Sequence, residues 1–197
     1  MVEHNWKVFE IGAGNGVTAL SLSEMGCKAV ALEPSYNMRT LLYQKAFEKE
    51  IDSIIVDHSK WEDISIWELI DYGLVFACNS LHVTEMGFTH ALQKIFRAKP
   101  KNIFLVTEIS KTGSSIPLQH KGYEILFAKS YEVESSYAYH CYDEFEKHIK
   151  FLSKMGYKKY SKEDIWLRAI KKDGHIWIKD KAYTETLRDW TRRRCRG

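Results

Sequence analysis

The feature that most constrains this chain is an apolar segment that runs directly into a glycine-rich turn, Val8–Gly16. Glycines stand at positions 12, 14 and 16, and helical spacing of apolar residues follows at once. This change of pattern predicts a buried strand that turns sharply into a helix. Glycine permits the unusual backbone of such a turn and lets a ligand approach main-chain N–H groups at the helix start. The turn is therefore predicted to hold a ligand against bare backbone.

Two acidic residues accompany this turn. Glu10 precedes the first glycine by two positions, and Glu33 follows a second strand-like segment, Lys28–Leu32. In nucleotide-binding βαβ units, an acid at the tip of the second strand accepts hydrogen bonds from two ribose hydroxyls. The dinucleotide fingerprint G-x-G-x-x-G needs a third glycine where this chain has Val17, so the spacing here departs from it. The pattern predicts a nucleoside ligand without the dinucleotide signature.

The segment from Glu10 to Gly16 resembles motif I of the class I S-adenosylmethionine-dependent methyltransferases, E/D-x-G-x-G-x-G. The resemblance covers Val8–Glu108. It implies S-adenosylmethionine as the cofactor, with the loop backbone facing its methionine part and Glu33 on its ribose. It also implies that Asp57 accepts from the adenine amine. The cofactor-binding residues that the resemblance implies are Glu10, Gly12, Ala13, Gly14, Gly16, Glu33, Pro34, Met38, Asp57, His58, Asn79 and Leu81.

The resemblance supplies one candidate on the acceptor side, His82, and the positions and chemistry of the residues supply the others. His82 follows the fourth strand and is the candidate general base; the alternative is a histidine that packs or bonds a lid. A base is needed only for a hydroxyl or a protonated amine acceptor. The other substrate candidates are Glu108 and the tyrosines at 131, 137, 139 and 142. The alternative for Glu108 is a solvated strand end, and the alternative for the tyrosines is a partly buried hairpin on the surface. The substrate residues we predict are Glu108, Tyr137 and Tyr139.

Strand and helix patterns alternate through the first half of the chain. This alternation predicts an α/β fold with a doubly wound, mostly parallel sheet and helices on both faces, and the resemblance implies the seven-stranded, Rossmann-like form of that sheet. A helix at 143–155 precedes two strands joined by a tight turn at 172–174, and in the family such an antiparallel hairpin completes the sheet. The two strands of this hairpin are expected at 157–170 and 175–179. The strands expected after the first are 28–32, 54–56, 74–77 and 103–106, and the other expected helices are 17–25, 37–50, 60–69 and 86–98.

We expect one domain, 1–197, with a lid or substrate insertion at about 113–142. The family usually carries a helical segment ahead of the first strand, over the cofactor, and this chain begins about ten residues before its glycine turn. Three explanations stay open: a more open site, a later segment or partner subunit (a homodimer included) that covers it, or a truncated chain.

Composition restricts the remaining possibilities. The 197 residues are 45% hydrophobic, which suits one globular core, and the formal net charge is +3. The four cysteines are scattered without metal-ligand spacing, so we expect reduced thiols, no metal and a cytoplasmic protein. No apolar run is long enough to span a bilayer. The basic tail at 191–196 could contact RNA phosphates, although short terminal charge runs are usually solvated.

The favoured function is an S-adenosylmethionine-dependent methyltransferase with a small-molecule acceptor. Within the same chemistry, the alternative is an RNA or protein acceptor. From other classes, the alternatives are an NAD-dependent oxidoreductase and a non-catalytic cofactor-binding or scaffold protein. The glycine spacing and the lack of a Tyr-x-x-x-Lys motif weigh against the oxidoreductase.

Overall fold

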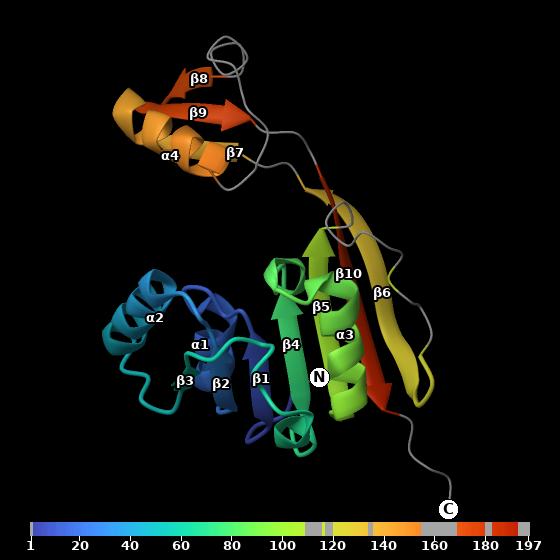
Figure 1. Cartoon of the computed structure of the whole chain (residues 1–197). Helices are drawn as coiled ribbons and strands as arrows, with labels where there is room; N and C mark the ends of the chain where they lie inside the picture. The colour runs from blue at the N-terminus through green and yellow to red at the C-terminus, as the bar shows by residue number, and fades with distance from the viewer. Residues whose placement is uncertain are drawn as a thin grey trace, which may run out of the picture. The chain divides into compact units, whose positions relative to one another are not determined.

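The computed structural model describes residues 2–108, 116, 120–133, 136–154, 169–179 and 183–192. The chain divides into two compact units, one formed by Met1–Tyr131 with Thr184–Gly197 and the other by Glu132–Tyr183 (Figure 1). The elements in chain order are β1 (Lys7–Ile11), α1 (Val17–Glu24), β2 (Lys28–Leu32), α2 (Tyr36–Glu48), β3 (Ile55–Asp57), η1 (Ile66–Leu69), β4 (Leu74–Cys78), η2 (Leu81–Val83), α3 (Gly87–Ala98), β5 (Asn102–Glu108), β6 (Tyr123–Val133), β7 (Ser136–Tyr139), α4 (Tyr142–Lys154), β8 (Ala169–Lys172), β9 (His175–Lys179) and β10 (Tyr183–Arg192).

The first unit is built on a seven-stranded sheet with the order β3-β2-β1-β4-β5-β10-β6 (Figure 1). Strands β1 to β5 pair in parallel, and β10 pairs antiparallel with β5. The order reverses between β1 and β4, because β2 and β3 lie to one side of β1 and the later strands lie to the other. The predicted doubly wound, mostly parallel α/β sheet is confirmed. Ligands of such sheets bind beyond the carboxyl ends of the strands at this reversal.

Side chains alternate along the parallel strands between two cores. Phe9 of β1 joins the largest cluster, together with Ile95 of α3. Its neighbour Val8 points to the opposite face and packs with Leu22 of α1, and Leu42 of α2 packs with the alanines of β2. Helices therefore cover both faces of the sheet, which explains why its central strands are continuous apolar runs.

The segment 60–69 was predicted to be a helix, and this prediction is wrong for most of its length. Only η1 is helical, as one 3-10 turn that begins after Ser65. The Ser65 side chain accepts the N–H of Trp67, and Glu68 accepts the N–H of Ser65. This capping box starts a new turn inside the segment. The apolar spacing still marks the core correctly, because Trp61 and Ile64 are buried.

The carboxy-terminal strands depart from the predicted arrangement. The antiparallel hairpin exists as β8 and β9, with positive φ of 52° at Asp173 and 74° at Gly174 in the turn. It belongs to a separate three-stranded sheet, β7-β9-β8, and does not complete the main sheet. β10 and β6 complete the main sheet, and Trp190 and Thr186 of β10 are fully buried there. The turn is encoded locally, whereas the sheet that a strand joins depends on distant residues.

The second unit has its own small core. Phe145 of α4 packs edge-to-face on Tyr139 of β7, with ring centroids 5.3 Å apart. The predicted strand 157–170 falls mostly on residues outside the described part, and its last two residues lie in β8. The insertion predicted at about 113–142 overlaps β6, whereas the compact unit covers 132–183. In the described part of the chain, the helices are too short or too polar to cross a bilayer.

Candidate functional site

The loop between β1 and α1 is held by close contacts at two of its glycines. Gly12 and Gly16 have φ of 68° and 80°, in the region that favours glycine. A Cβ at Gly12 would lie 2.5 Å from Cβ of Ser80, and one at Gly16 would lie 2.6 Å from Cγ of Leu42. The Ser80 hydroxyl also donates to the carbonyl of Ile11, which joins the ends of β4 and β1. Packing of the fold itself therefore requires these two glycines.

The middle glycine of the loop is different. Gly14 has φ of 57°, but a Cβ there would meet no atom within 4 Å, so the main chain is bare. Its N–H donates to Oε2 of Glu33 at 2.7 Å, and Oε1 of Glu33 accepts the N–H of Ser35 at 2.8 Å. A carboxylate offers about four acceptor positions. Glu33 therefore keeps capacity for two further donors, such as the hydroxyls of a ribose.

Glu10 is a buried carboxyl group at the end of β1. It is 3% exposed, and its Oε2 has no hydrogen-bond partner among the described residues. Burial raises the pKa of Glu10 to about 8, and hydrogen bonds with the Ala19 backbone and the Thr18 side chain oppose this shift, while the charge of Glu33 adds to it. A nearby cation would favour the ionised form, whereas an anion would oppose it. This position therefore suits an ammonium or sulfonium ligand better than a pyrophosphate.

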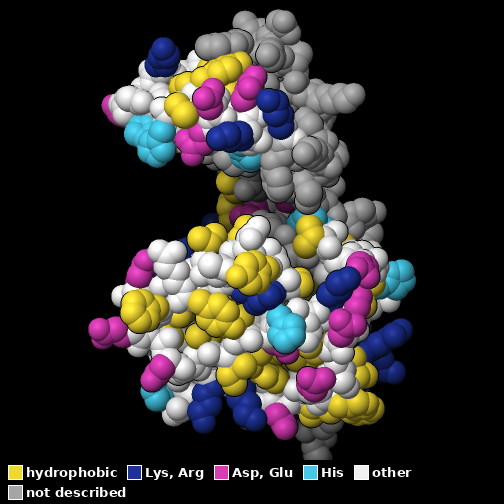
Figure 2. Space-filling view, turned by 60° about the vertical axis from the view of Figure 1, so that its left-hand side comes forward, with side chains coloured by type: hydrophobic (Ala, Val, Ile, Leu, Met, Phe, Trp, Pro, Cys, Tyr) yellow, Lys and Arg dark blue, Asp and Glu magenta, His cyan; other side chains and the backbone are white. Residues whose placement is uncertain are grey.

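The residues predicted around an adenine lie at the tips of β2 and β3. The N–H of Glu33 donates to the carbonyl of Asp57 at 2.8 Å, so the two tips are adjacent. One carboxylate oxygen of Asp57 accepts an N–H in a local turn. Pro34, Met38 and His58 are exposed. Figure 2 shows hydrophobic side chains gathered on the side of the first unit that carries α2. Exposed apolar atoms beside an acceptor suit the flat face and the amine of a purine.

The end of β4 is bridged to the antiparallel side of the sheet through one side chain. Asn79 has φ of 49°, and its Oδ1 accepts the N–H of Glu108 at 2.8 Å. Its Nδ2 donates to Oε1 of Glu185 at 2.7 Å, and Oε2 of Glu185 accepts the hydroxyl of Tyr131 at 2.8 Å. The bridge fixes the loop that follows β4. Sequence reasoning missed Glu185, because only the register of β10 on β5 places it opposite Glu108.

The other residues of the predicted site have different surroundings. Leu81 is 1% exposed and belongs to the main core, so it supports the loop from inside. Ala13 is also buried, and its N–H donates to the carbonyl of Leu32 at 2.9 Å. His82 is half-buried in η2. Its role as a base stays a prediction.

Two predicted substrate residues belong to the second unit. Tyr139 is buried, and its hydroxyl lies 2.6 Å from Nδ1 of His148. Tyr137 lies in β7, and its side chain is outside the described part. Glu108, in the first unit, is the last residue of β5 and is half-buried. A contact of any of the three with an acceptor remains a prediction.

Comparison with known proteins identifies the fold. No protein-family model matches the chain, and no curated protein matches its sequence. A candidate methyltransferase of Bacillus halodurans matches 96% of this chain and 94% of its own with a TM-score of 0.61 at 10% identity. The YcgJ protein of Bacillus subtilis matches with a TM-score of 0.57 at 13% identity over 98% and 94% of the two chains.

A third solved structure contains ligands. It is phosphoethanolamine N-methyltransferase 2 of Haemonchus contortus, in complex with phosphomonomethylethanolamine and S-adenosylhomocysteine. It matches 98% of this chain and 50% of its own, with a TM-score of 0.55 at 10% identity. Together these likenesses show the class I S-adenosylmethionine-dependent methyltransferase fold, which confirms the fold expected from the sequence resemblance. At such identities they show the fold alone, and function has to be argued from the site.

Proposed function

We propose that the chain is an S-adenosylmethionine-dependent methyltransferase. One observation carries the proposal: where the strand order reverses, the bare main chain of Gly14 is hydrogen-bonded to Glu33. A nucleoside there uses one carboxylate for its ribose while the rest of the ligand lies against the loop. The buried carboxyl group of Glu10 favours a ligand with positive charge over a dinucleotide. The methyltransferase names of fold relatives support the same reading.

S-adenosylmethionine, when bound, supplies a methyl group on a positively charged sulfur. The residues of the chain bind and orient: Glu33 takes the ribose hydroxyls, Asp57 takes the adenine amine, and Glu10 in its ionised form attracts the cationic methionine part. Alignment of an acceptor with the methyl carbon is worth about 7–11 kcal/mol in favourable systems. The bridge through Asn79 keeps the β4 loop rigid while the acceptor is held.

We also propose a small-molecule acceptor. The loop Asn79–His82 lacks the N/D-P-P-Y/F pattern that similar enzymes use on nucleobase and glutamine amines. For a hydroxyl or protonated amine, His82 would accept the proton that the acceptor loses, a contribution of about 10²–10⁴-fold. Replacement of His82 by Ala would then lower kcat by that factor and leave cofactor affinity unchanged.

Calorimetry with S-adenosylmethionine and S-adenosylhomocysteine tests the proposal. Glu33→Ala should weaken both by at least about 10–150-fold, because even a single hydrogen bond to a charged group contributes about 1.5–3 kcal/mol. Glu48→Ala is the matched control, since Glu48 is an exposed carboxylate of α2 that accepts only from Gln44 among the hydrogen bonds found. Equal affinity of the Glu33 variant and wild type, or tighter binding of NADH than of either nucleoside, would refute the assignment.

A further inference from the structure

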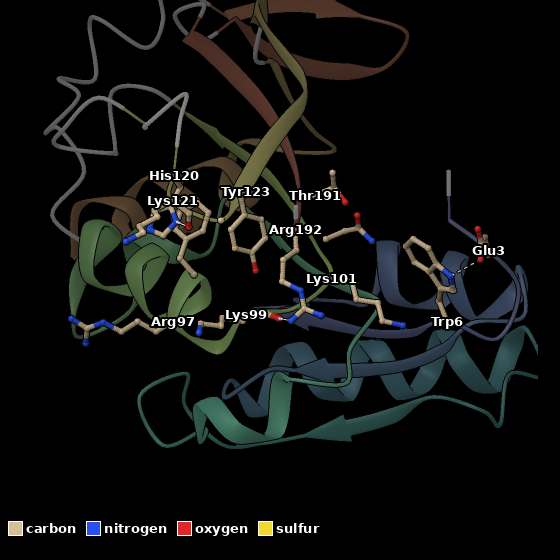
Figure 3. A pocket seen from close by; sticks show the side chains of 13 residues that line it. Glu3, Trp6, Arg97, Lys99, Lys101, His120, Lys121, Tyr123, Thr191 and Arg192 are labelled. Carbon is tan, nitrogen blue, oxygen red and sulfur yellow. Dashed lines mark hydrogen bonds between the residues drawn. The ribbon is translucent and has the colours of Figure 1, made fainter. Parts of the chain in front are cut away.

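A hollow lies at the opposite end of the sheet from the glycine loop. It has a volume of about 1160 Å³ and is lined at the starts of β1 and β5, the end of α3 and the end of β10 (Figure 3). β4 and β5 have five and seven residues, and at about 3.3 Å per residue they separate the two ends by roughly 15–20 Å. A ligand in this hollow is therefore remote from the proposed methyl-transfer site.

The hollow is strongly positive. Five exposed cations line it, and they lie at four elements of the first unit: Arg97 and Lys99 at the end of α3, Lys101 before β5, Lys121 before β6, and Arg192 at the end of β10. The ion pairs found within the described residues involve none of them. The carboxylate of the lining, on Glu3, accepts the indole N–H of Trp6 at 3.0 Å. The cations are therefore available to an external anion.

The fold accounts for only part of this charge. Arg97 and Lys99 lie at the carboxyl end of α3, where the helix dipole favours cations. Arg192 has a structural hydrogen bond as well, from Nη1 to the carbonyl of Lys99 at 2.8 Å. Lys101 and Lys121 do not lie at a helix end, and in the described part of the chain neither forms an ion pair with a carboxylate. Their repulsion with the other cations opposes folding, and a bound anion would remove that repulsion.

Aromatic rings accompany the cations. The ring of His120 stacks on Phe96, with centroids 3.9 Å apart and an interplanar angle of 3°. Trp6 is half-buried against Gly73, and Figure 3 shows Trp6 and His120 on opposite sides of Arg192. A positive groove that follows a phosphate backbone, with aromatic faces for bases, is the combination that binds single-stranded nucleic acids.

The sequence extends the same composition. β10 ends at Arg192 in the lining of the hollow, and the next residues of the chain include Arg193, Arg194 and Arg196. The five cations that line the hollow can neutralise several phosphates, which is the main source of affinity in sequence-tolerant nucleic-acid binding.

We propose that this hollow binds the phosphodiester backbone of a single-stranded nucleic acid, with bases placed against Trp6 and His120. The site is separate from the glycine loop, so the strand it holds need not be the methyl acceptor. RNA and DNA share the backbone chemistry that the hollow recognises.

Fluorescence anisotropy tests this with labelled RNA and DNA strands of about 12 nucleotides, within the range that single-strand binders cover. The test variant carries Arg97→Gln, Lys101→Gln and Lys121→Gln, all exposed. The control carries Lys147→Gln, Lys171→Gln and Lys172→Gln, equally exposed in the second unit. We expect at least a tenfold loss of affinity for the test variant and less than a twofold loss for the control. The slope of log affinity against log salt should fall by about 0.7 per lost phosphate contact.

Three results would overturn the proposal. Equal losses in the two triple variants would show an effect of net charge alone. Loss on deletion of Arg193–Gly197, with the triple variant unaffected, would assign binding to the tail without the hollow. Binding to phosphatidylserine vesicles with none to either strand would assign the hollow to a membrane surface. S-adenosylhomocysteine affinity should be unchanged in the triple variant, so failure here is distinguishable from failure of the proposed function.

Discussion

The two ends of the seven-stranded sheet carry different ionisable groups. The amino end, where the parallel strands β1 to β5 begin, has the five cations that line the hollow. Carboxyl groups in or directly after five strands gather at the carboxyl end, beside the glycine loop. These are Glu10 of β1, Glu33 after β2, Asp57 of β3, Glu108 of β5 and Glu185 of β10. One scaffold thus offers a site suited to a sulfonium cation and, at the other end, a surface suited to a polyanion.

The charges at the two ends are also held differently. At the carboxyl end, Glu33 accepts two backbone N–H groups and Glu185 accepts from Asn79 and Tyr131. At the amino end, Lys101 and Lys121 extend into solvent. Preorganised groups give geometric selection of one ligand, whereas exposed cations give sequence-tolerant, salt-dependent attraction. We therefore expect the carboxyl end to select one ligand and the amino end to bind nucleic-acid strands of many sequences.

The largest effect is expected from Gly12→Ala. The added Cβ would overlap Ser80 at 2.5 Å, in a backbone with φ of 68°. Overpacking costs about 1–3 kcal/mol and the left-handed conformation about 1–2 kcal/mol, so urea denaturation should show a loss of about 2–5 kcal/mol. Gly122→Ala, with positive φ and open space, should lose only the conformational part. Equal losses would mean that the β1–β4 contact is not tight.

Gly14→Ala should affect the ligand more than the fold. Its Cβ would enter open space, so stability should fall by only about 1–2 kcal/mol. The alanine methyl group would fill the open space over the Gly14 main chain, where the ligand is proposed to lie. We therefore expect S-adenosylhomocysteine affinity to fall about tenfold or more by calorimetry. Gly174→Ala in the β8–β9 turn imposes the same backbone strain elsewhere. If that control lost affinity equally, the loop would not be the ligand contact.

The carboxyl end could largely be predicted from the sequence, and the amino end could not. The glycine turn, Glu33 and Asp57 follow directly from apolar runs that end in acids, because parallel strands bring their carboxyl ends together. The hollow depends on β10, which pairs with β5 across about 80 residues of chain. No local pattern places Arg192 beside Lys101. Glu185 was missed for the same reason.

Glu10, at the carboxyl end of the sheet, should make the stability of the protein depend on pH. Its pKa is about 8 in the folded protein against an ordinary 4.5, so the folded state binds the extra proton between these values. Its contribution to stability is complete below pH 4.5 and is lost as pH rises toward 8, by up to about 1.4 kcal/mol per unit. Glu10→Gln should flatten this slope in denaturation series, whereas Glu48→Gln should not. A cationic cofactor that binds ionised Glu10 should release a proton, measurable by calorimetry in buffers of different ionisation enthalpy.

The smallest expected effect comes from a pair of arginines, one at each end. Arg39 donates from Nη1 to the carbonyls of Glu33 and Pro34 at 2.9 and 2.8 Å, so it braces the tip of β2. Arg192 makes a single such bond, to Lys99, among neighbouring cations.

Arg192→Gln should therefore change stability by less than about 1 kcal/mol, because the lost hydrogen bond is offset by relief of repulsion. Arg39→Gln should cost more stability, by about 1 kcal/mol, and also weaken S-adenosylhomocysteine binding. The Arg192 variant should lose oligonucleotide affinity alone; a reversed ranking of the two arginines would mean that the amino-end cations stabilise the fold and are not held for a ligand.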